Sequence, residues 1–165
     1  MGFERLTDQD IEKLIKTPKR VANPLARVTL KGCYEQLNYK LHALDDSKEE
    51  FQLSTRRNIE TGMEDDYSCG LSRITPHGES LALCRYHGPS HVHLNSLEGK
   101  RLNLVCHIHR ATKKYCDGGQ KAEGVDFETT RYHSLQEALH CLVQDCCIEG
   151  LKTDPEGWNQ IELFG

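Results

Sequence analysis

The chain has 165 residues, of which 37% are hydrophobic and 28% are charged, and its formal net charge is −4. This length and composition fit one folded domain over residues 1–165 and exclude a disordered chain. No apolar run approaches the roughly 20 residues of a membrane-spanning helix, and residues 1–6 have no apolar signal core, so we expect a cytoplasmic protein with no membrane partner.

The first predicted element is a short amphipathic helix near the N-terminus. Thr7 is a favourable N-cap, and apolar side chains recur at helical spacing at Ile11, Leu14 and Ile15. Pro18 disfavours a continuing helix, so we expect the helix to end there.

Five segments after this helix favour β-strands, because their composition and alternation of apolar residues are typical of strands. They are residues 28–44, 48–59, 67–75, 79–87 and 102–112. Asp45-Asp46-Ser47 and Pro76-His77-Gly78 separate two pairs of these segments and are typical of hairpin turns. The pattern predicts an antiparallel β-meander of about five strands.

The clearest helix signal lies near the C-terminus. Ser134-Leu-Gln-Glu137 is a capping box, and Gly150 is a typical helix stop. Between them, apolar side chains follow one helical face: Leu135, Ala138, Leu139, Leu142, Val143 and Cys146. We expect an α+β domain whose meander packs against an N-terminal and a C-terminal helix, with residues 151–165 as a candidate for a loosely docked tail.

The eight cysteines are expected to be reduced. Cys84 and Cys106 fall in apolar strand segments, and Cys141 and Cys146 fall on the C-terminal helix. A free cysteine behaves as a small buried hydrophobe, and disulfides belong to oxidising compartments. The chain has no Cys-x-x-Cys pair, which argues against a zinc ribbon.

Five of the nine histidines fall between residues 84 and 112, and four of them form two His-x-His pairs. These pairs are His91/His93 and His107/His109. Side chains two residues apart share one face of a strand, so each pair can present two imidazoles together. Imidazole transfers protons near neutral pH and also ligates transition metals.

Positive charge is concentrated in the same segment. Residues 1–84 carry a net charge of −2, residues 85–114 a net charge of +5, and residues 115–165 a net charge of −7. The positive block predicts an anionic ligand such as phosphate or an RNA backbone. The candidate nucleic-acid-binding residues are Arg85, Tyr86, Lys100, Arg101, Lys113 and Lys114.

Two blander interpretations of these charges stand beside that one. The cations at positions 100, 101, 113 and 114 could simply be solvated loop charges. Arg56-Arg57 is interpreted as balancing the acidic 60–66 segment, which contains four carboxylates.

Strand alternation gives an expected position for each histidine. If Cys106 and Ile108 face the helices, His107 and His109 should face solvent or a cleft. Gly88-Pro89-Ser90 and residues 94–99 are loop-like, so His91 and His93 should lie on a loop over the strand end. Strict alternation turns Arg110 toward the apolar face, so a role for Arg110 beside the histidines requires a bulge or a strand end.

Two resemblances follow from these motifs. Arg-Tyr-x-Gly-Pro-x-His-x-His-x-Asn over 85–95, Glu-Gly at 98–99, His-x-His-Arg-Ala-Thr over 107–112 and Cys-Cys-Ile at 146–148 resemble a bacterial domain family of uncharacterised activity. Residues 80–150 are also similar to the TumE-type toxins of toxin–antitoxin pairs, which carry an Arg-Tyr strand before a His-rich turn. These resemblances imply a bacterial ribonuclease-like toxin, with a cognate antitoxin or defence-system protein as partner.

The residues themselves suffice for metal-independent RNA cleavage. A base removes the 2′-hydroxyl proton, an acid protonates the leaving oxygen, and a cation stabilises the phosphorane. The candidate catalytic residues are His91, His93, His107, His109 and Arg110. Arg85 and Arg110 would bind phosphate, and Tyr86 would stack on a base or donate a proton.

Two other functions remain open at this point. His91, His93, His107 and His109 could converge on one zinc ion, which takes three or four such ligands. Alternatively, the protein could be a non-enzymatic inhibitor or binding module of a phage or mobile element that acts on a bacterial defence system, docking through its acidic C-terminal third. This binding module would tolerate histidine substitutions and lose function on charge reversal within residues 117–128.

Overall fold

The computed structural model describes residues 6–89, 93–95, 100–102, 105–111 and 125–151, and only the backbone of 93–95, 100–102, 125 and 126. The described chain forms these elements in order: α1 (Asp8–Lys16), β1 (Lys19–Val21), β2 (Thr29–Lys31), β3 (Tyr34–Ala43), β4 (Glu50–Asn58), β5 (Tyr67–Ile74), β6 (Ser80–His87), β7 (His93–Asn95), β8 (Lys100–Leu102), β9 (His107–Arg110), β10 (Val125–Glu128), α3 (Leu135–Asp145) and β11 (Ile148–Glu149). None of the described helices is both long enough and apolar enough to span a bilayer.

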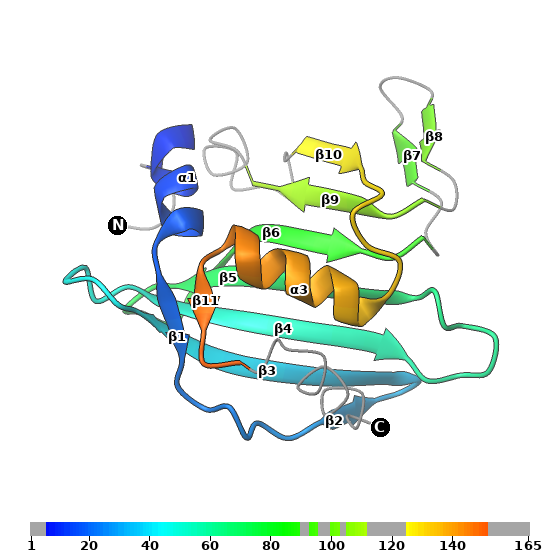
Figure 1. Ribbon diagram of the computed structural model, residues 1–165, viewed down its shortest axis with the longest axis horizontal. Coiled ribbons are helices and arrows are strands. Elements are labelled where there is room, and N and C mark those ends of the chain that lie inside the picture. The colour runs from blue at the N-terminus through cyan, green and yellow to red at the C-terminus, as the bar shows by residue number, and fades with distance from the viewer. Residues whose placement is uncertain (1–5, 90–92, 96–99, 103–104, 112–124, 152–165) are drawn as a thin grey trace.

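The strands form a large, mostly antiparallel sheet with the order β10-β9-β6-β5-β4-β3-β1-β11, and β2 adds to β3 (Figure 1). Only the pairing of β1 with β11 is parallel within the described part of the sheet. The α+β class is therefore confirmed, but the expectation of about five strands is wrong, because this sheet has nine. The additional strands are short segments that carry weak sequence signals.

The predicted strand boundaries hold for the central hairpins and fail at both ends. Residues 28–44 split into β2 and β3 around Gly32, which has a φ of 62°. The expected strand over 102–112 is also divided. Leu102 pairs with His93 in the separate β7-β8 hairpin, and only His107–Arg110 joins the sheet as β9.

Helix α3 lies across one face of the sheet, as Figure 1 shows, and its apolar side chains form the core with that face. The buried residues on the strands include Leu37, Tyr39, Phe51, Leu53, Leu71, Leu81 and Tyr86. Ser134 caps the helix by accepting a hydrogen bond from Glu137 N at 3.2 Å, as predicted. The helix ends at Asp145 rather than near Gly150, because Cys147 adopts a φ of 56° and the next two residues pair with β1.

A β-bulge in β6 decides which side chains face α3. Leu71 pairs with Cys84 and Ser72 pairs with Ala82, so Leu83 is an extra residue on β6. Leu83 and Cys84 are both buried, and Cys84 and Tyr86 therefore join the core. The residue between them, Arg85, projects from the opposite face of the sheet.

Lys19 joins the C-terminal ends of both helices. Its side chain is fully buried, and Nζ donates to the carbonyl oxygens of Ile15 at 2.8 Å, Thr17 at 2.7 Å and Cys146 at 2.9 Å. These carbonyls lie where α1 and α3 end, and helix dipoles place partial negative charge there. The ammonium also lies 4.6 Å from the centroid of the Phe51 ring. Burial lowers the pKa of Lys19 to about 8, and the three acceptors compensate the lost hydration.

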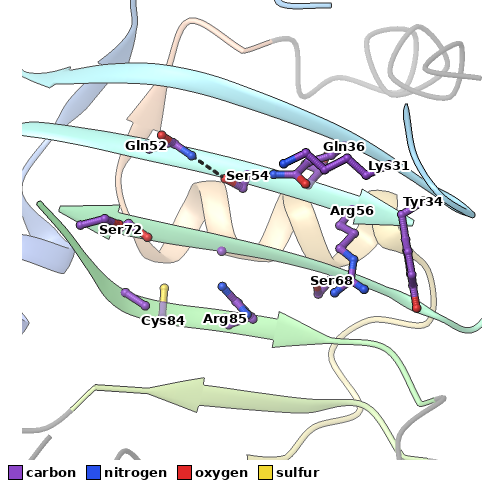
Figure 2. Close-up of a pocket in the computed structure, with 14 residues that line it drawn as sticks. Lys31, Tyr34, Gln36, Gln52, Ser54, Arg56, Ser68, Ser72, Cys84 and Arg85 are labelled. Atoms are coloured by element: carbon purple, nitrogen blue, oxygen red, sulfur yellow. Dashed lines mark hydrogen bonds between the residues drawn. The ribbon is translucent and has the colours of Figure 1, made fainter. Parts of the chain in front are cut away.

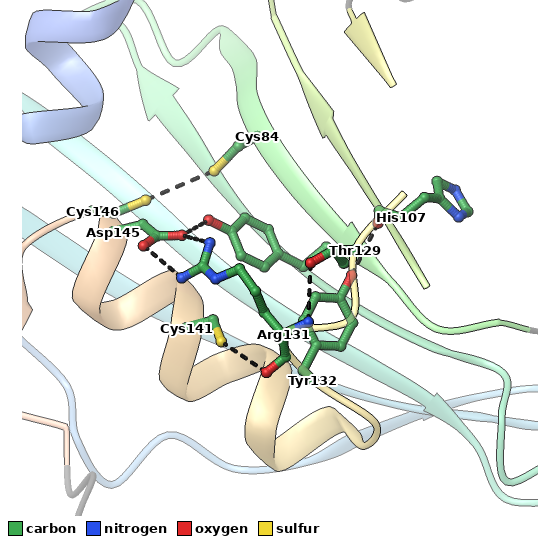
Figure 3. Close-up of polar contacts among 9 residues, drawn as sticks. Cys84, His107, Thr129, Arg131, Tyr132, Cys141, Asp145 and Cys146 are labelled. Carbon is green, nitrogen blue, oxygen red and sulfur yellow. Dashed lines mark hydrogen bonds and ion pairs between the residues drawn. The ribbon is translucent and has the colours of Figure 1, made fainter. Parts of the chain in front are cut away.

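A second polar cluster fastens α3 to β6 (Figure 3). The Asp145 carboxylate accepts hydrogen bonds from Arg131 Nη1 at 2.8 Å and Nη2 at 2.9 Å, and another from the Tyr86 hydroxyl. Desolvation raises the pKa of Asp145, but the hydrogen bonds from Arg131 and Tyr86 outweigh it, so the pKa lies below its usual value. The Tyr86 ring also stacks on Tyr132, with centroids 5.9 Å apart.

The seven described cysteines carry free thiols, and five of them are buried, in agreement with the sequence prediction. Cys84 Sγ and Cys146 Sγ lie 3.8 Å apart between β6 and the end of α3. Burial raises the pKa of Cys69, which keeps that thiol protonated at neutral pH.

We expect Lys19→Met to lower the free energy of unfolding by about 3 kcal/mol or more, because it leaves three buried carbonyl oxygens without their donor. Urea unfolding at neutral pH measures the loss. The control is Lys40→Met on β3, where the lysine is exposed and the change should stay within about 0.5 kcal/mol. Equal losses in the two variants would show that the Lys19 ammonium has no special role.

We expect Asp145→Asn to lower the free energy of unfolding by about 1–3 kcal/mol at pH 7. The Asp145 pKa is lowered in the folded protein, so its contribution is complete above the unfolded pKa of about 4 and is lost as pH falls through the folded pKa. The difference between Asp145→Asn and the parent should therefore shrink below about pH 4. Glu149→Gln, which removes an exposed carboxylate paired with Arg20, is the control and should have little effect at any pH.

Candidate functional site

The sheet face opposite α3 is not covered by any described helix, and it carries a hollow lined by polar side chains (Figure 2). The hollow has a volume of about 560 Å³ and extends from β2 and β3 across to β6. Ligand sites in proteins commonly have volumes of about 300–1,000 Å³. The size alone therefore makes this hollow a candidate binding site.

The floor of the hollow consists of small side chains on the central strands. They are Ser54 on β4, Ser68, Gly70 and Ser72 on β5, and Ala82 on β6. A Cβ atom on Gly70 would lie 3.0 Å from the Cys84 carbonyl oxygen and 3.5 Å from Arg85 Nε. A larger residue at Gly70 would thus crowd both the floor and the arginine beside it.

Three cations border this floor, namely Lys31 at the end of β2, Arg56 on β4 and Arg85 on β6. None of the residues that line the hollow, all of which belong to the described chain, is acidic. Arg85 is exposed and forms no ion pair with another described residue. The hollow is therefore a positively charged site in a protein whose net charge is negative.

Arg56 is held in place by an aromatic ring. Its guanidinium carbon lies 3.7 Å from the centroid of Tyr34, and the Tyr34 hydroxyl donates to Asp66 Oδ2 at 2.6 Å. Asn58 Nδ2 also donates to this oxygen, at 3.0 Å. The hydrogen bond to Asp66 raises the pKa of Tyr34. The arginine is thereby oriented before any ligand arrives.

Side-chain amides and a hydroxyl form a hydrogen-bonded network along one side of the hollow. Asn38 Oδ1 accepts from Ser54 Oγ at 2.9 Å, from Gln36 Nε2 at 3.1 Å and from Gln52 Nε2 at 3.3 Å. Gln36, Gln52 and Ser54 line the hollow itself. The surface is rich in donors and is suited to a polar ligand rather than an apolar one.

Histidines continue this face beyond Arg85. Arg85 pairs with His109 and His87 pairs with His107 across β6 and β9, so all four share one face of the sheet. The rings of His87 and His107 stack with centroids 4.6 Å apart. The Tyr132 hydroxyl lies 2.8 Å from the His87 carbonyl oxygen and 3.0 Å from that of His107, which fixes the two strands together.

The structure brings together only part of the predicted catalytic set. His109 is half-buried and lies opposite Arg85, as a site on this face requires. His107 is fully buried, so the expectation that it faces solvent or a cleft is wrong. Its ring stacks on His87 instead, so His107 contributes to packing between β6 and β9.

Arg110 and Tyr86 lie away from the histidines on this face. Arg110 is the last residue of β9, keeps the strand alternation, and forms an ion pair with Glu12 of α1. Tyr86 is buried on the α3 side, where its hydroxyl bonds Asp145. Neither side chain can contact a ligand in the hollow, because the sheet lies between them.

Other predicted residues fall outside the described side chains. His91, Lys113 and Lys114 lie outside the described residues altogether. His93, Lys100 and Arg101 are described by their backbone alone, in the β7-β8 hairpin, so the expectation that His93 lies on a loop is wrong. Their assigned roles therefore stay predictions.

The zinc hypothesis also stays a prediction. The described residues contain no group of three His, Cys, Asp or Glu side chains placed to hold a metal ion. Of the four proposed ligands, the structure describes the side chains of His107 and His109 alone.

Two cations of the hollow, Lys31 and Arg56, are missing from the sequence-based site. The interpretation of Arg56-Arg57 as a balance for the 60–66 segment is wrong for Arg57, whose Nε pairs with Glu35 at 2.9 Å. Arg56 lies over Tyr34, whose hydroxyl bonds Asp66 of that segment. The polar alternation of Gln52, Ser54 and Arg56 on β4 was the available signal.

Comparisons of the chain with protein-family models, with curated proteins and with solved structures gave no match. The two resemblances described above are therefore neither supported nor refuted by them.

We expect His107→Ala to lower the free energy of unfolding by about 1–3 kcal/mol, because it removes a buried ring that stacks on His87. His109→Ala removes a half-buried ring and should cost less than about 0.5 kcal/mol. Urea unfolding of both variants measures the difference. Equal and small losses would contradict a structural role for His107.

Proposed function

We propose that the protein binds RNA across the open face of its sheet and cleaves it beside Arg85. The observation that carries this proposal is the row formed by Arg56 on β4, Arg85 on β6 and His109 on β9. Neighbouring strands lie about 4.8 Å apart, so the row crosses about 14 Å of sheet. A short stretch of extended RNA backbone can follow such a row.

Electrostatics favours a polyanion at this face. The residues that line the hollow include three cations and no carboxylate. Guanidinium groups bind phosphate oxygens through paired, charge-assisted hydrogen bonds. The serine hydroxyls and the glutamine amides of the hollow add neutral donors for phosphate, ribose or base edges.

The proposed cleavage uses His109 as a proton-transfer group and Arg85 as the cation. His109 would take the proton of the ribose 2′-hydroxyl, the 2′-oxygen would bond to phosphorus, and the bond from phosphorus to the 5′-oxygen would break. Arg85 would stabilise the phosphorane charge. We assign protonation of the leaving oxygen to His91 or His93, as the sequence predicts. The buried ring of His107 packs against His87.

One observation favours a second function, binding without cleavage. His107 is buried, so of the two β9 histidines of the expected mechanism only His109 is available beside Arg85 in the described part of the site. A binding module or inhibitor would use the hollow and its cations without any proton transfer. The association with a toxin–antitoxin or defence system rests on the sequence resemblance alone.

The test combines binding and cleavage of a single-stranded RNA in the presence of a chelator. Arg85→Ala should weaken binding about tenfold and flatten its salt dependence by about one unit of slope, because one phosphate contact is lost. His109→Ala should keep the binding and slow cleavage by about a hundredfold or more. Arg20→Ala, at an exposed ion pair with Glu149, is the control for loss of charge.

Each possible result separates the alternatives. RNA binding without cleavage by the parent protein would leave the binding module as the function. An RNA affinity that does not change with salt or with Arg85→Ala would contradict both functions.

A further inference from the structure

We infer that the hollow holds a terminal phosphomonoester group of a nucleotide. The group could belong to a free nucleotide or to the phosphorylated end of an RNA strand. The inference deepens the proposed RNA binding and rests on it only for the second of these two sources.

The lining of the hollow indicates a strongly polar ligand. Its floor is made of small residues that include Ser68, Gly70 and Ser72, and the amides of Gln36 and Gln52 lie beside them. Tyr34 is the single aromatic residue of the lining, and its ring is already covered by Arg56. The lining offers an apolar ligand little beyond Ala82 and Cys84, whereas a phosphate with its ribose can bond to the hydroxyl, amide and guanidinium donors of the hollow.

The position of the two arginines indicates where the phosphate lies. Arg56 pairs with Ser68 across β4 and β5, and Arg85 pairs with Gly70 across β5 and β6. The two arginines thus lie on the two strands that flank β5, and Figure 2 shows Arg56 reaching toward Ser68. The missing side chain at Gly70 makes room for Arg85, whose Nε lies 3.5 Å from the position that a Cβ on Gly70 would take. A phosphate over Ser68 could accept hydrogen bonds from both arginines.

The amount of charge indicates a terminal phosphate rather than an internal one. Lys31, Arg56 and Arg85 place three positive charges around one hollow that has no acidic lining residue. An internal phosphodiester carries a single negative charge. A phosphomonoester carries about 1.5 to 2 negative charges at pH 7, because its second pKa is about 6. The monoester therefore neutralises the site more completely.

The experiment compares two pairs of probes that differ only in this group. One pair is a short RNA with a 5′-phosphate and the same RNA with a 5′-hydroxyl, and the other is adenosine 5′-monophosphate and adenosine. Affinities are measured on the full chain by calorimetry or fluorescence anisotropy. We expect the phosphorylated member of each pair to bind about tenfold tighter, which corresponds to one additional charge-assisted interaction.

Two adjacent arginines provide matched variants. Arg56→Gln should remove most of the preference for the phosphorylated probes. Arg57→Gln removes the same charge one residue along β4, but its guanidinium pairs with Glu35 away from the hollow, so the preference should remain. Urea unfolding of both variants shows whether the fold is kept.

The pH dependence separates the ligand's charge from that of nearby histidines. The ratio of the two affinities within a pair should rise from about pH 5 to about pH 7.5 as the monoester becomes a dianion. Protonation of His87 or His109, which share this face, would strengthen anion binding in the opposite direction, at low pH. A ratio that falls with pH would contradict the inference.

The outcomes distinguish this inference from the proposed function. A preference in both pairs supports a nucleotide phosphate of either source, and a preference in the RNA pair alone supports an RNA end. If the two RNAs bind with equal affinity, and Arg85→Ala weakens the binding of both, the inference is overturned and the proposed RNA binding is kept. Tight binding of the mononucleotide without binding of either RNA would support the inference and overturn the proposed function.

Discussion

The fold depends on one buried ammonium group. Lys19 begins the strand that follows α1, and its three hydrogen bonds join the end of that helix to the end of α3. These two helices lie more than a hundred residues apart in the chain, so no local signal brings their ends together. The parallel pairing of β1 with β11 follows directly from this junction, because it places Ile148 beside Lys19.

This arrangement gives the two faces of the sheet different tasks. The face toward α3 supplies the apolar core and the cluster of Asp145, Arg131 and Tyr86. The opposite face has small and polar side chains, whose exposure costs little because they remain hydrated. A binding surface can therefore be built there without weakening the core.

Much of the fold could be predicted from sequence, because its signals are local. Thr7 and Ser134 cap the helices as expected, and the two central hairpins follow from alternation and turn residues. The bulge at Leu83 could not be predicted, since its cause is pairing with β5 and with Ala111, whose N–H donates to the Leu83 carbonyl at 2.9 Å. Strict alternation would have placed Arg85 with Leu83 in the core.

The candidate site was predicted only in part, for a related reason. Arg85 and the histidines lie in one short stretch of sequence, so their pattern can be recognised without knowing the fold. Lys31 and Arg56 come from distant strands, and only the order of strands in the sheet places them beside Arg85. Burial of His107 is likewise a tertiary effect, because it arises from stacking on His87.

Cys84 contacts both faces of the sheet. Its sulfur touches Cys146 at the end of α3, and its carbonyl oxygen lies just under the position that a side chain on Gly70 would occupy. A bulky adduct on that thiol would have to displace either the helix end or the strand. Modification of the Cys84 thiol in the core would thus shift β6 and with it the floor of the hollow on the opposite face of the sheet.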